Sequence, residues 1–235
     1  MSRLTNWLRN RRARRTEEYL PALATVHRTI LPRNYFEIGV STGRSLALAS
    51  VPSVAVDPNP KVDVALAAPV RLYPMTSDRF FAEEVLDEPI DFAFIDGMHR
   101  VEFVLRDFMN IEARAHAGTV VAMDDVMPED IAYTARDQTP GAWTGDVYRI
   151  IPLLRRYRPD LDVRVYDVVQ KGLGIVTRLD PSSRVLPQMY DRIVAELDRG
   201  AFLEASAAAI RAAIRPRPTT RLASDLAKFR RRSRS

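Results

Sequence analysis

The chain reads Phe36-Glu37-Ile38-Gly39-Val40-Ser41-Thr42-Gly43 over residues 36–43. A short apolar run ends here in an acidic residue, and small residues follow at alternate positions. Small residues let the backbone approach a ligand closely, and Gly43 can adopt dihedral angles that other residues resist. The pattern is typical of the turn between a strand and a helix in a ligand-binding α/β protein. We therefore expect a strand at 35–39 and a helix from Ser45 to about Ser50.

Other apolar runs in the chain also end in acidic residues. These are Asp57 after residues 54–56, Asp96 after residues 90–95, and the pair Asp124-Asp125 after residues 119–123. In open α/β sheets, ligands bind just outside the carboxyl ends of the strands. Carboxylates that are brought together repel one another and lose hydration, so such a group needs ligand hydroxyls, amines or a metal ion. The sequence therefore predicts one ligand-binding cleft that contains these acids.

Strands and helices alternate along the chain. We expect strands at 35–39, 53–57, 70–73, 90–95, 119–123, 161–169 and 173–179, and helices at 16–31, from Ser77 to before Pro89, 100–116, 145–158 and within 183–213. The connection at 170–172 is tight, so the last two strands should be antiparallel. This order predicts a doubly wound α/β sheet with right-handed crossovers.

Length and composition indicate one domain of good size. The chain has 235 residues, of which 46% are hydrophobic, and no cysteine. The absence of cysteine excludes disulfides, thiolate metal sites and cysteine nucleophiles, and it fits a cytoplasmic protein. No apolar run reaches the roughly 18 residues that a membrane-spanning helix needs, and no secretory signal is evident.

Positive charge is concentrated at the two ends. Residues 1–15 carry six arginines and no acid, and residues 211–235 carry nine Lys or Arg against Asp225 alone. The two ends together therefore have a charge of +14. Since the net charge of the chain is +5, the residues between them have a charge of −9. We therefore expect a basic arm at 1–15, one domain at 16–213 and a basic tail at 214–235. No nucleic-acid partner is expected for the body, because such folds carry positive charge on the folded surface. The favoured interpretation is that both ends are solvated or loosely helical; the other is contact with an anionic surface, through Leu4, Trp7 and Leu8 at the first end.

The turn at 37–43 resembles the first motif of class I S-adenosylmethionine-dependent methyltransferases, an acidic residue followed by Gly-x-Gly-x-Gly, with Ser41 in place of the middle glycine. The resemblance extends over about residues 34–178. It implies a Rossmann-like α/β fold with a mostly parallel seven-stranded sheet, a C-terminal antiparallel hairpin and helices on both faces. It also implies S-adenosylmethionine as cofactor. Its residues would be Glu37, Gly39 and Gly43 around the methionyl part, Asp57 on the ribose hydroxyls, and Ser77 and Asp78 near the adenine, with Ser41 also at the cofactor.

The acids at the next two strand ends resemble those of macrocin-type and catechol-type O-methyltransferases. That resemblance implies one Mg²⁺ held by Asp96, Asp124 and Asp125, with Asp96 also at the cofactor and in the catalytic site. It implies His99 as the general base that deprotonates a hydroxyl of a small molecule or sugar-containing metabolite. Asp125 has a second interpretation, as a cap of the following turn. We expect substrate contacts from 126–148, where Met127, Tyr133, Trp143 and Tyr148 lie, and structural roles for His27 and His116.

Two other functions stay open at this point. An NAD(P)-dependent oxidoreductase on a similar sheet is disfavoured, because the turn lacks the G-x-G-x-x-G pattern that grips a pyrophosphate. A non-catalytic nucleotide-binding or membrane-associated protein would act through its basic ends. The sequence also leaves the oligomeric state open, a homo-oligomer included.

Overall fold

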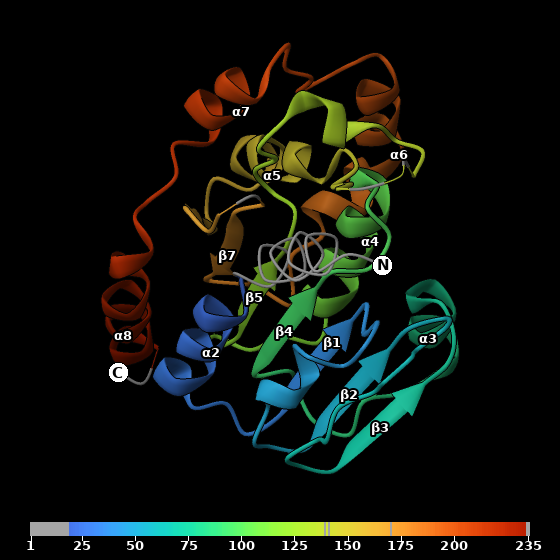
Figure 1. The fold of residues 1–235 in the computed structure, drawn as a ribbon, viewed down its shortest axis with the longest axis vertical. Coiled ribbons are helices and arrows are strands. Elements are labelled where there is room, and N and C mark those ends of the chain that lie inside the picture. The colour runs from blue at the N-terminus through green and yellow to red at the C-terminus, as the bar shows by residue number, and fades with distance from the viewer. Residues whose placement is uncertain (1–18, 139, 141, 170, 234–235) are drawn as a thin grey trace, which may run out of the picture.

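The computed structural model describes residues 19–138, 140, 142–169 and 171–233 (Figure 1). Seven strands form one sheet in the order β3-β2-β1-β4-β5-β7-β6. The strands are β1 (Tyr35–Ile38), β2 (Ser53–Val56), β3 (Val70–Tyr73), β4 (Phe92–Ile95), β5 (Val120–Met123), β6 (Asp162–Tyr166) and β7 (Leu173–Thr177). The first five strands are parallel, and β7 pairs antiparallel with both β5 and β6. The predicted fold class is confirmed.

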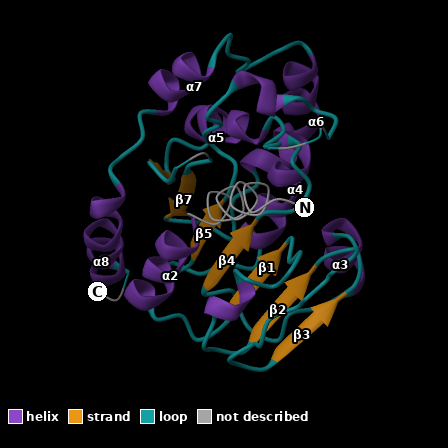
Figure 2. Cartoon of the chain, in the orientation of Figure 1, coloured by secondary structure: helices purple, strands orange, loops and turns teal. Residues whose placement is uncertain are grey.

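Helices cover both faces of the sheet (Figures 1 and 2). One face carries α3 (Ser77–Glu83), α4 (Val101–Glu112), α5 (Ile150–Tyr157), α6 (Val185–Asp198) and α7 (Ala207–Ile214), whose buried side chains share one apolar cluster. The other face carries α2 (Tyr19–Ile30) and α8 (Leu222–Arg232), together with the short 3₁₀ turn η1 (Leu46–Leu48). The sheet is therefore buried on both faces, which is why its parallel strands are almost continuously apolar.

The helix expected from Ser45 to about Ser50 is only the single 3₁₀ turn η1. Ala49 already has an extended backbone, with φ −77° and ψ 125°. The chain must then reach Pro52, and a residue before proline is disfavoured in the helical region. Among the described residues of 126–144, the regular element is the 3₁₀ turn η2 (Ile131–Thr134), and α5 is preceded by the 3₁₀ turn η3 (Val147–Arg149).

Most of the C-terminal segment that the sequence suggested as a basic tail is folded. Helix α8 packs against α2, and its Leu222 and Leu226 are buried. The carboxylate of Asp225, also buried, accepts hydrogen bonds from the Tyr166 hydroxyl and from Arg217. Arg217 also pairs its backbone with β6, through bonds to Val165 and Asp167. Counting charges missed this packing, because the count ignores Leu222 and Leu226, which lie four residues apart on the buried side of the helix.

The expectations for residues 1–15, including Leu4, Trp7 and Leu8, lie outside the described residues. Within the described part of the chain, no helix combines the length and the apolar character that crossing a membrane requires.

Candidate active site

A cavity of about 590 Å³ lies at the carboxyl edge of the parallel strands. Its walls come from the turn after β1, the end of β2, the start of α3, the end of β4 and the turn between β6 and β7. Six of the residues expected at the cofactor line it: Gly39, Ser41, Asp57, Ser77, Asp78 and Asp96. His99 and Lys171 line it as well. Its volume falls within the roughly 300–1,000 Å³ of small-molecule sites.

Glu37 lies beneath this cavity and is not part of its lining. Its side chain is completely buried, and its carboxylate accepts hydrogen bonds from Tyr35 Oη at 2.7 Å and from Ser45 Oγ at 2.6 Å. Burial raises the pKa of Glu37 to about 8, although both hydrogen bonds oppose this rise. Gly43 is also absent from the lining. Glu37 therefore supports the turn from below, by joining β1 to the start of η1.

Gly39 allows the turns after β1 and β4 to touch. Its φ is +87°, and a Cβ at this position would lie 1.9 Å from the carbonyl oxygen of Asp96. Any other residue would separate the two turns or strain the backbone. Gly39 therefore brings Asp96 next to the first motif.

Asp57 holds the same turn from the end of β2. Its Oδ2 accepts hydrogen bonds from the backbone amides of Val40 and Ser41, both at 2.8 Å, and its Oδ1 accepts from the amide of Asn59 at 2.7 Å. A carboxylate oxygen can accept two hydrogen bonds. Oδ1 therefore keeps one acceptor position for a ligand hydroxyl.

Asp78 already has a cationic partner. The guanidinium of Arg106 in α4 donates two hydrogen bonds to its carboxylate, at 2.9 and 2.6 Å, and also covers the ring of Phe103 at 4.2 Å. Ser77 donates to the buried carboxyl of Asp107, whose pKa burial raises to about 7. Both residues thus connect α3 to α4 at the cavity wall.

The acids at the ends of β4 and β5 surround His99. Nε2 of His99 lies 3.4 Å from Asp96 Oδ1 and 3.1 Å from Asp125 Oδ2. Burial alone would lower the pKa of His99, but the charges of Asp125 and Asp96 outweigh it and raise this pKa to about 9. Asp125 has a φ of +60°, an uncommon backbone conformation for a residue other than glycine. Such strain is often found at functional sites.

The other ring nitrogen of His99 faces the segment before α5. Nδ1 lies 3.3 Å from the carbonyl oxygen of Trp143, and the two rings stack with centroids 4.8 Å apart. Gly145 makes this approach possible: its φ is +55°, and a Cβ there would lie 1.6 Å from the carbonyl oxygen of His99. The segment around Trp143 thus fixes the position of the imidazole.

Asp146 anchors that segment to α4. Its Oδ1 accepts a hydrogen bond from the amide of Val101 at 2.9 Å, which satisfies a free donor at the start of the helix. Its Oδ2 accepts from Arg149 at 2.7 Å and from Arg136 at 2.6 Å. The sequence analysis missed these roles, and the Asp-x-x-Arg spacing of 146–149 is the only signal that points to the pair.

Four residues were expected to contact substrate: Met127, Tyr133, Trp143 and Tyr148. Of these, Trp143 contacts His99. Tyr148 and Met127 are buried in the core. The hydroxyl of Tyr148 accepts a hydrogen bond from the amide of Glu204. Tyr133 uses its backbone carbonyl to bind the amides of Thr144 and Gly145. His27 and His116 are also remote from the cavity: His27 packs against Tyr35 and Phe92, and His116 contacts Asp91.

Lys171 was also missed by the sequence analysis. Its Nζ lies 2.9 Å from Asp125 Oδ1 and 3.4 Å from Asp124 Oδ2. Burial would lower the pKa of this ammonium, but Asp124, Asp125 and Asp96 together raise it above its ordinary value. Burial and repulsion from Asp125 raise the pKa of Asp124, and Lys171 opposes this rise. One feature of the sequence could have pointed to Lys171. The chain is rich in arginine and has only three lysines, Lys61, Lys171 and Lys228, and one of them lies in this turn.

The expected magnesium ligands do not form one set. Among the described residues, the acids and histidine close enough to hold one ion are Asp96, His99 and Asp125, whose ligand atoms lie within 4.8 Å of one another. Asp124 is not in this group and instead faces Lys171. Mg²⁺ requires near-octahedral oxygen ligands, whereas here an ammonium group contacts two of the three carboxylates. A divalent ion held by Asp96, Asp124 and Asp125 does not fit this arrangement.

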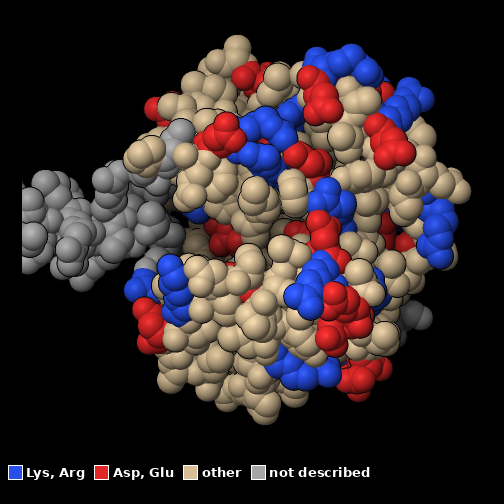
Figure 3. All heavy atoms as spheres, turned by 90° about the vertical axis from the view of Figure 1, so that its right-hand side faces the viewer, with Lys and Arg blue, Asp and Glu red and all other residues tan. Residues whose placement is uncertain are grey.

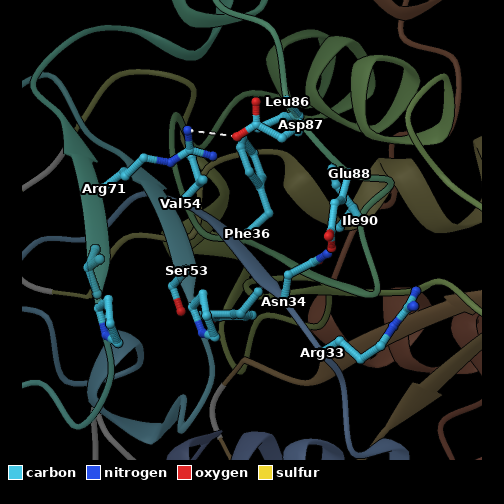
Figure 4. A pocket seen from close by; sticks show the side chains of 14 residues that line it. Arg33, Asn34, Phe36, Ser53, Val54, Arg71, Leu86, Asp87, Glu88 and Ile90 are labelled. Atoms are coloured by element: carbon cyan, nitrogen blue, oxygen red, sulfur yellow. Dashed lines mark ion pairs between the residues drawn. The ribbon is translucent and has the colours of Figure 1, made fainter.

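A second cavity, of about 570 Å³, lies at the opposite edge of the sheet, where β1, β2 and β3 begin (Figure 4). Its lining combines apolar residues such as Phe36 and Val54 with charged ones, among them Arg71 and Asp87, which form an ion pair at 3.1 Å. It contains none of the acids that follow the strands. We therefore place the candidate active site at the first cavity.

Basic and acidic side chains are interspersed on the face of the described residues that Figure 3 shows. No large region of one sign covers this face. This view therefore offers no support for a nucleic-acid interface there.

Comparison with known proteins agrees with this geometry. Residues 36–126 match the model of a family described as a methyltransferase domain. No curated protein matches the chain. Among solved structures, the chain is similar to the O-methyltransferase TomG from Streptomyces achromogenes, which is involved in tomaymycin synthesis and was solved in complex with SAM. The two share 16% sequence identity with a TM-score of 0.53, over 67% of this chain and 78% of that chain.

The cofactor-bound protein Rv0187 from MTB is similar to the same extent. It shares 19% identity with a TM-score of 0.50, over 70% of this chain and 80% of that chain. At such identities the structural similarity shows the fold alone. The match over residues 36–126 additionally identifies this part of the chain as similar to a methyltransferase domain. Together they confirm the resemblance to class I methyltransferases.

Proposed function

We propose, from the methyltransferase domain at 36–126, that this protein transfers a methyl group from S-adenosylmethionine to a hydroxyl of a small molecule. The observation that carries the proposal is the cavity at the carboxyl edge. In it, Asp57, the turn after β1, Asp96 and His99 lie around one space of about 590 Å³.

The chain offers distinct groups for the parts of this cofactor. Oδ1 of Asp57 has an acceptor position left for a ribose hydroxyl, and Phe103 lines the cavity together with Ser77 and Asp78. Asp57 and Asp96 both line the cavity, and their carboxylates favour a cationic ligand over a pyrophosphate. When bound, S-adenosylmethionine supplies an electrophilic methyl group on a sulfonium centre.

His99 is the group that removes the proton from the hydroxyl. The carbonyl oxygen of Trp143 can accept a hydrogen bond only from a protonated Nδ1, so in the neutral ring the lone pair is on Nε2. Nε2 is also the nitrogen that faces Asp96 and Asp125, which stabilise the imidazolium formed when the proton is taken up. The burial of this site limits the access of water to the reacting groups. None of these steps uses a metal ion.

Cofactor titration tests the proposal. In calorimetry, we expect the protein to bind S-adenosylhomocysteine and not NAD, and Asp57→Ala to weaken S-adenosylhomocysteine binding at least about tenfold, since it removes a charged hydrogen-bonding partner of the ligand and of the turn. Asp87→Ala, at the second cavity, is the matched control and should bind like the wild type. Binding of NAD without S-adenosylhomocysteine would favour an oxidoreductase instead.

A further inference from the structure

We propose that the ammonium group of Lys171 is the permanent counter-cation of the carboxylates at the end of β5, in the place that a divalent metal ion would otherwise take. The inference concerns the proposed active site, but it does not require that methyl transfer be the reaction. It makes Lys171 the residue that excludes Mg²⁺ from this protein.

The two buried carboxylates of Asp124 and Asp125 require a positive charge beside them. The side chains of Asp124 and Asp125 are 0% and 1% exposed. Oδ1 of Asp124 has no hydrogen-bond partner, and the two oxygens of Asp125 face Lys171 Nζ at 2.9 Å and His99 Nε2 at 3.1 Å. Two adjacent carboxylates in such a position are strongly destabilising unless a positive charge lies beside them. Lys171 is the cationic side chain within ion-pair distance of Asp124 in the described part of the chain.

The backbone fixes Lys171 at this position. Its carbonyl oxygen accepts a hydrogen bond from the amide of Met127 at 2.6 Å, and the amide of Gly172 binds the carbonyl of Val168 at 3.0 Å. The turn between β6 and β7 is therefore attached to the loop that leaves β5 only two residues after Asp125. The lysine and the two acids are thus held in one local unit. Lys171 is 21% exposed at its side chain, which leaves little room for it to turn away into solvent.

The ammonium and a divalent ion would lie too close to each other at these two acids. Nζ approaches one oxygen of each acid, and a second cation placed at the remaining oxygens would lie within a few ångströms of it. The repulsion between the two charges is large at such distances in a partly buried site. Neutralising the lysine should therefore open the site to a metal.

Manganese binding, measured in the absence of cofactor, tests the inference. We use Mn²⁺ as the probe, followed by calorimetry and by the paramagnetic signal of the free ion. The wild type should show no saturable binding at millimolar Mn²⁺, and Lys171→Met should bind one equivalent with an affinity at least about tenfold above the detection limit set by the wild type. Lys228→Met, an exposed lysine on α8, is the matched control and should bind like the wild type.

Saturable binding of one equivalent by the wild type would overturn the inference. Failure of a folded Lys171→Met to gain the site would also overturn it. Lys171→Met leaves Asp124 and Asp125 without their lysine and could therefore fail to fold. In that case the double variant Lys171→Met with Asp124→Asn is measured instead, because it removes one charge of each sign. It should bind Mn²⁺ through the acids that remain, and a folded double variant without binding has the same meaning as a folded single one. Since no cofactor is present, a failure of S-adenosylmethionine binding would leave this result unaffected.

Discussion

The carbonyl oxygen of Trp143 lies 3.3 Å from Nδ1 of His99, and the indole ring stacks on the imidazole with centroids 4.8 Å apart. This contact spans 44 residues of sequence and joins the turn after β4 to the segment before α5. It leaves the other nitrogen of His99 facing Asp96 and Asp125. The predicted base is therefore positioned by a segment that the sequence analysis assigned to substrate binding.

Gly145→Ala should move His99 without removing it. The new Cβ would lie 1.6 Å from the carbonyl oxygen of His99, so one of the two segments must shift. A displacement of about 1 Å can lower turnover about 100-fold, whereas binding of S-adenosylhomocysteine should stay close to that of the wild type. Initial rates and calorimetry give the two values. Gly200→Ala is the control: its φ of +88° brings similar strain, but it meets only Leu203. Equal turnover in the two variants would count against a positioning role.

The rate of methyl transfer should rise with pH through about 9. His99 faces Asp96 and Asp125, which raise its pKa to about 9, and Lys171, which lowers it. Below that pH the ring is protonated and does not act as a base, so kcat/KM should increase as the proton is lost. Rates from about pH 6 to about pH 10 should show this rising limb. His99→Gln should lower turnover about 100-fold or more and abolish the limb. An unchanged profile in that variant would show that another group titrates.

Glu37→Gln should remove a pH dependence of folding stability. The pKa of Glu37 is raised to about 8 from an ordinary value of 4.5. The folded protein therefore keeps a proton that the unfolded chain releases, and stability falls as pH rises through this window. The loss is on the order of several kcal/mol, since one pKa unit is about 1.4 kcal/mol.

Urea unfolding at about pH 5 and about pH 9 measures this effect. The free energy of unfolding of Glu37→Gln should decrease less between these values than that of the wild type. Glu88→Gln, which changes an exposed residue, should follow the wild type. If all three proteins lose the same stability, Glu37 is ionised in the folded state.

Leu226→Ala should destabilise the whole domain, because α8 is part of the packed structure. Leu226 is 2% exposed, and removing such a side chain costs about 2–5 kcal/mol. Leu203→Ala is the control, since Leu203 is 58% exposed and such changes usually cost within about 0.5 kcal/mol. Urea unfolding of both variants checks the difference. A small loss for Leu226→Ala would support a loosely attached C-terminal segment instead.

The sequence determined the sheet and the residues that follow its strands. Short apolar runs that end in acids, separated by helical stretches, define a doubly wound sheet, because both patterns depend on neighbours along the chain. The same rule placed Asp57 and Asp96 at one edge, since the carboxyl ends of parallel strands meet there. The tight turn at 170–172 also predicted the antiparallel hairpin.

Only the tertiary structure decided which charges meet. Lys171 reaches Asp124 across 47 residues of sequence and also pairs with Asp125, and Asp225 joins α8 to β6 across 59. No periodicity records such pairs, because they depend on how the hairpin and the last helix pack against the sheet. For the same reason, the sequence could show that Glu37 belongs to the first motif but not that it lies under the turn, where burial and two hydroxyl groups define its role.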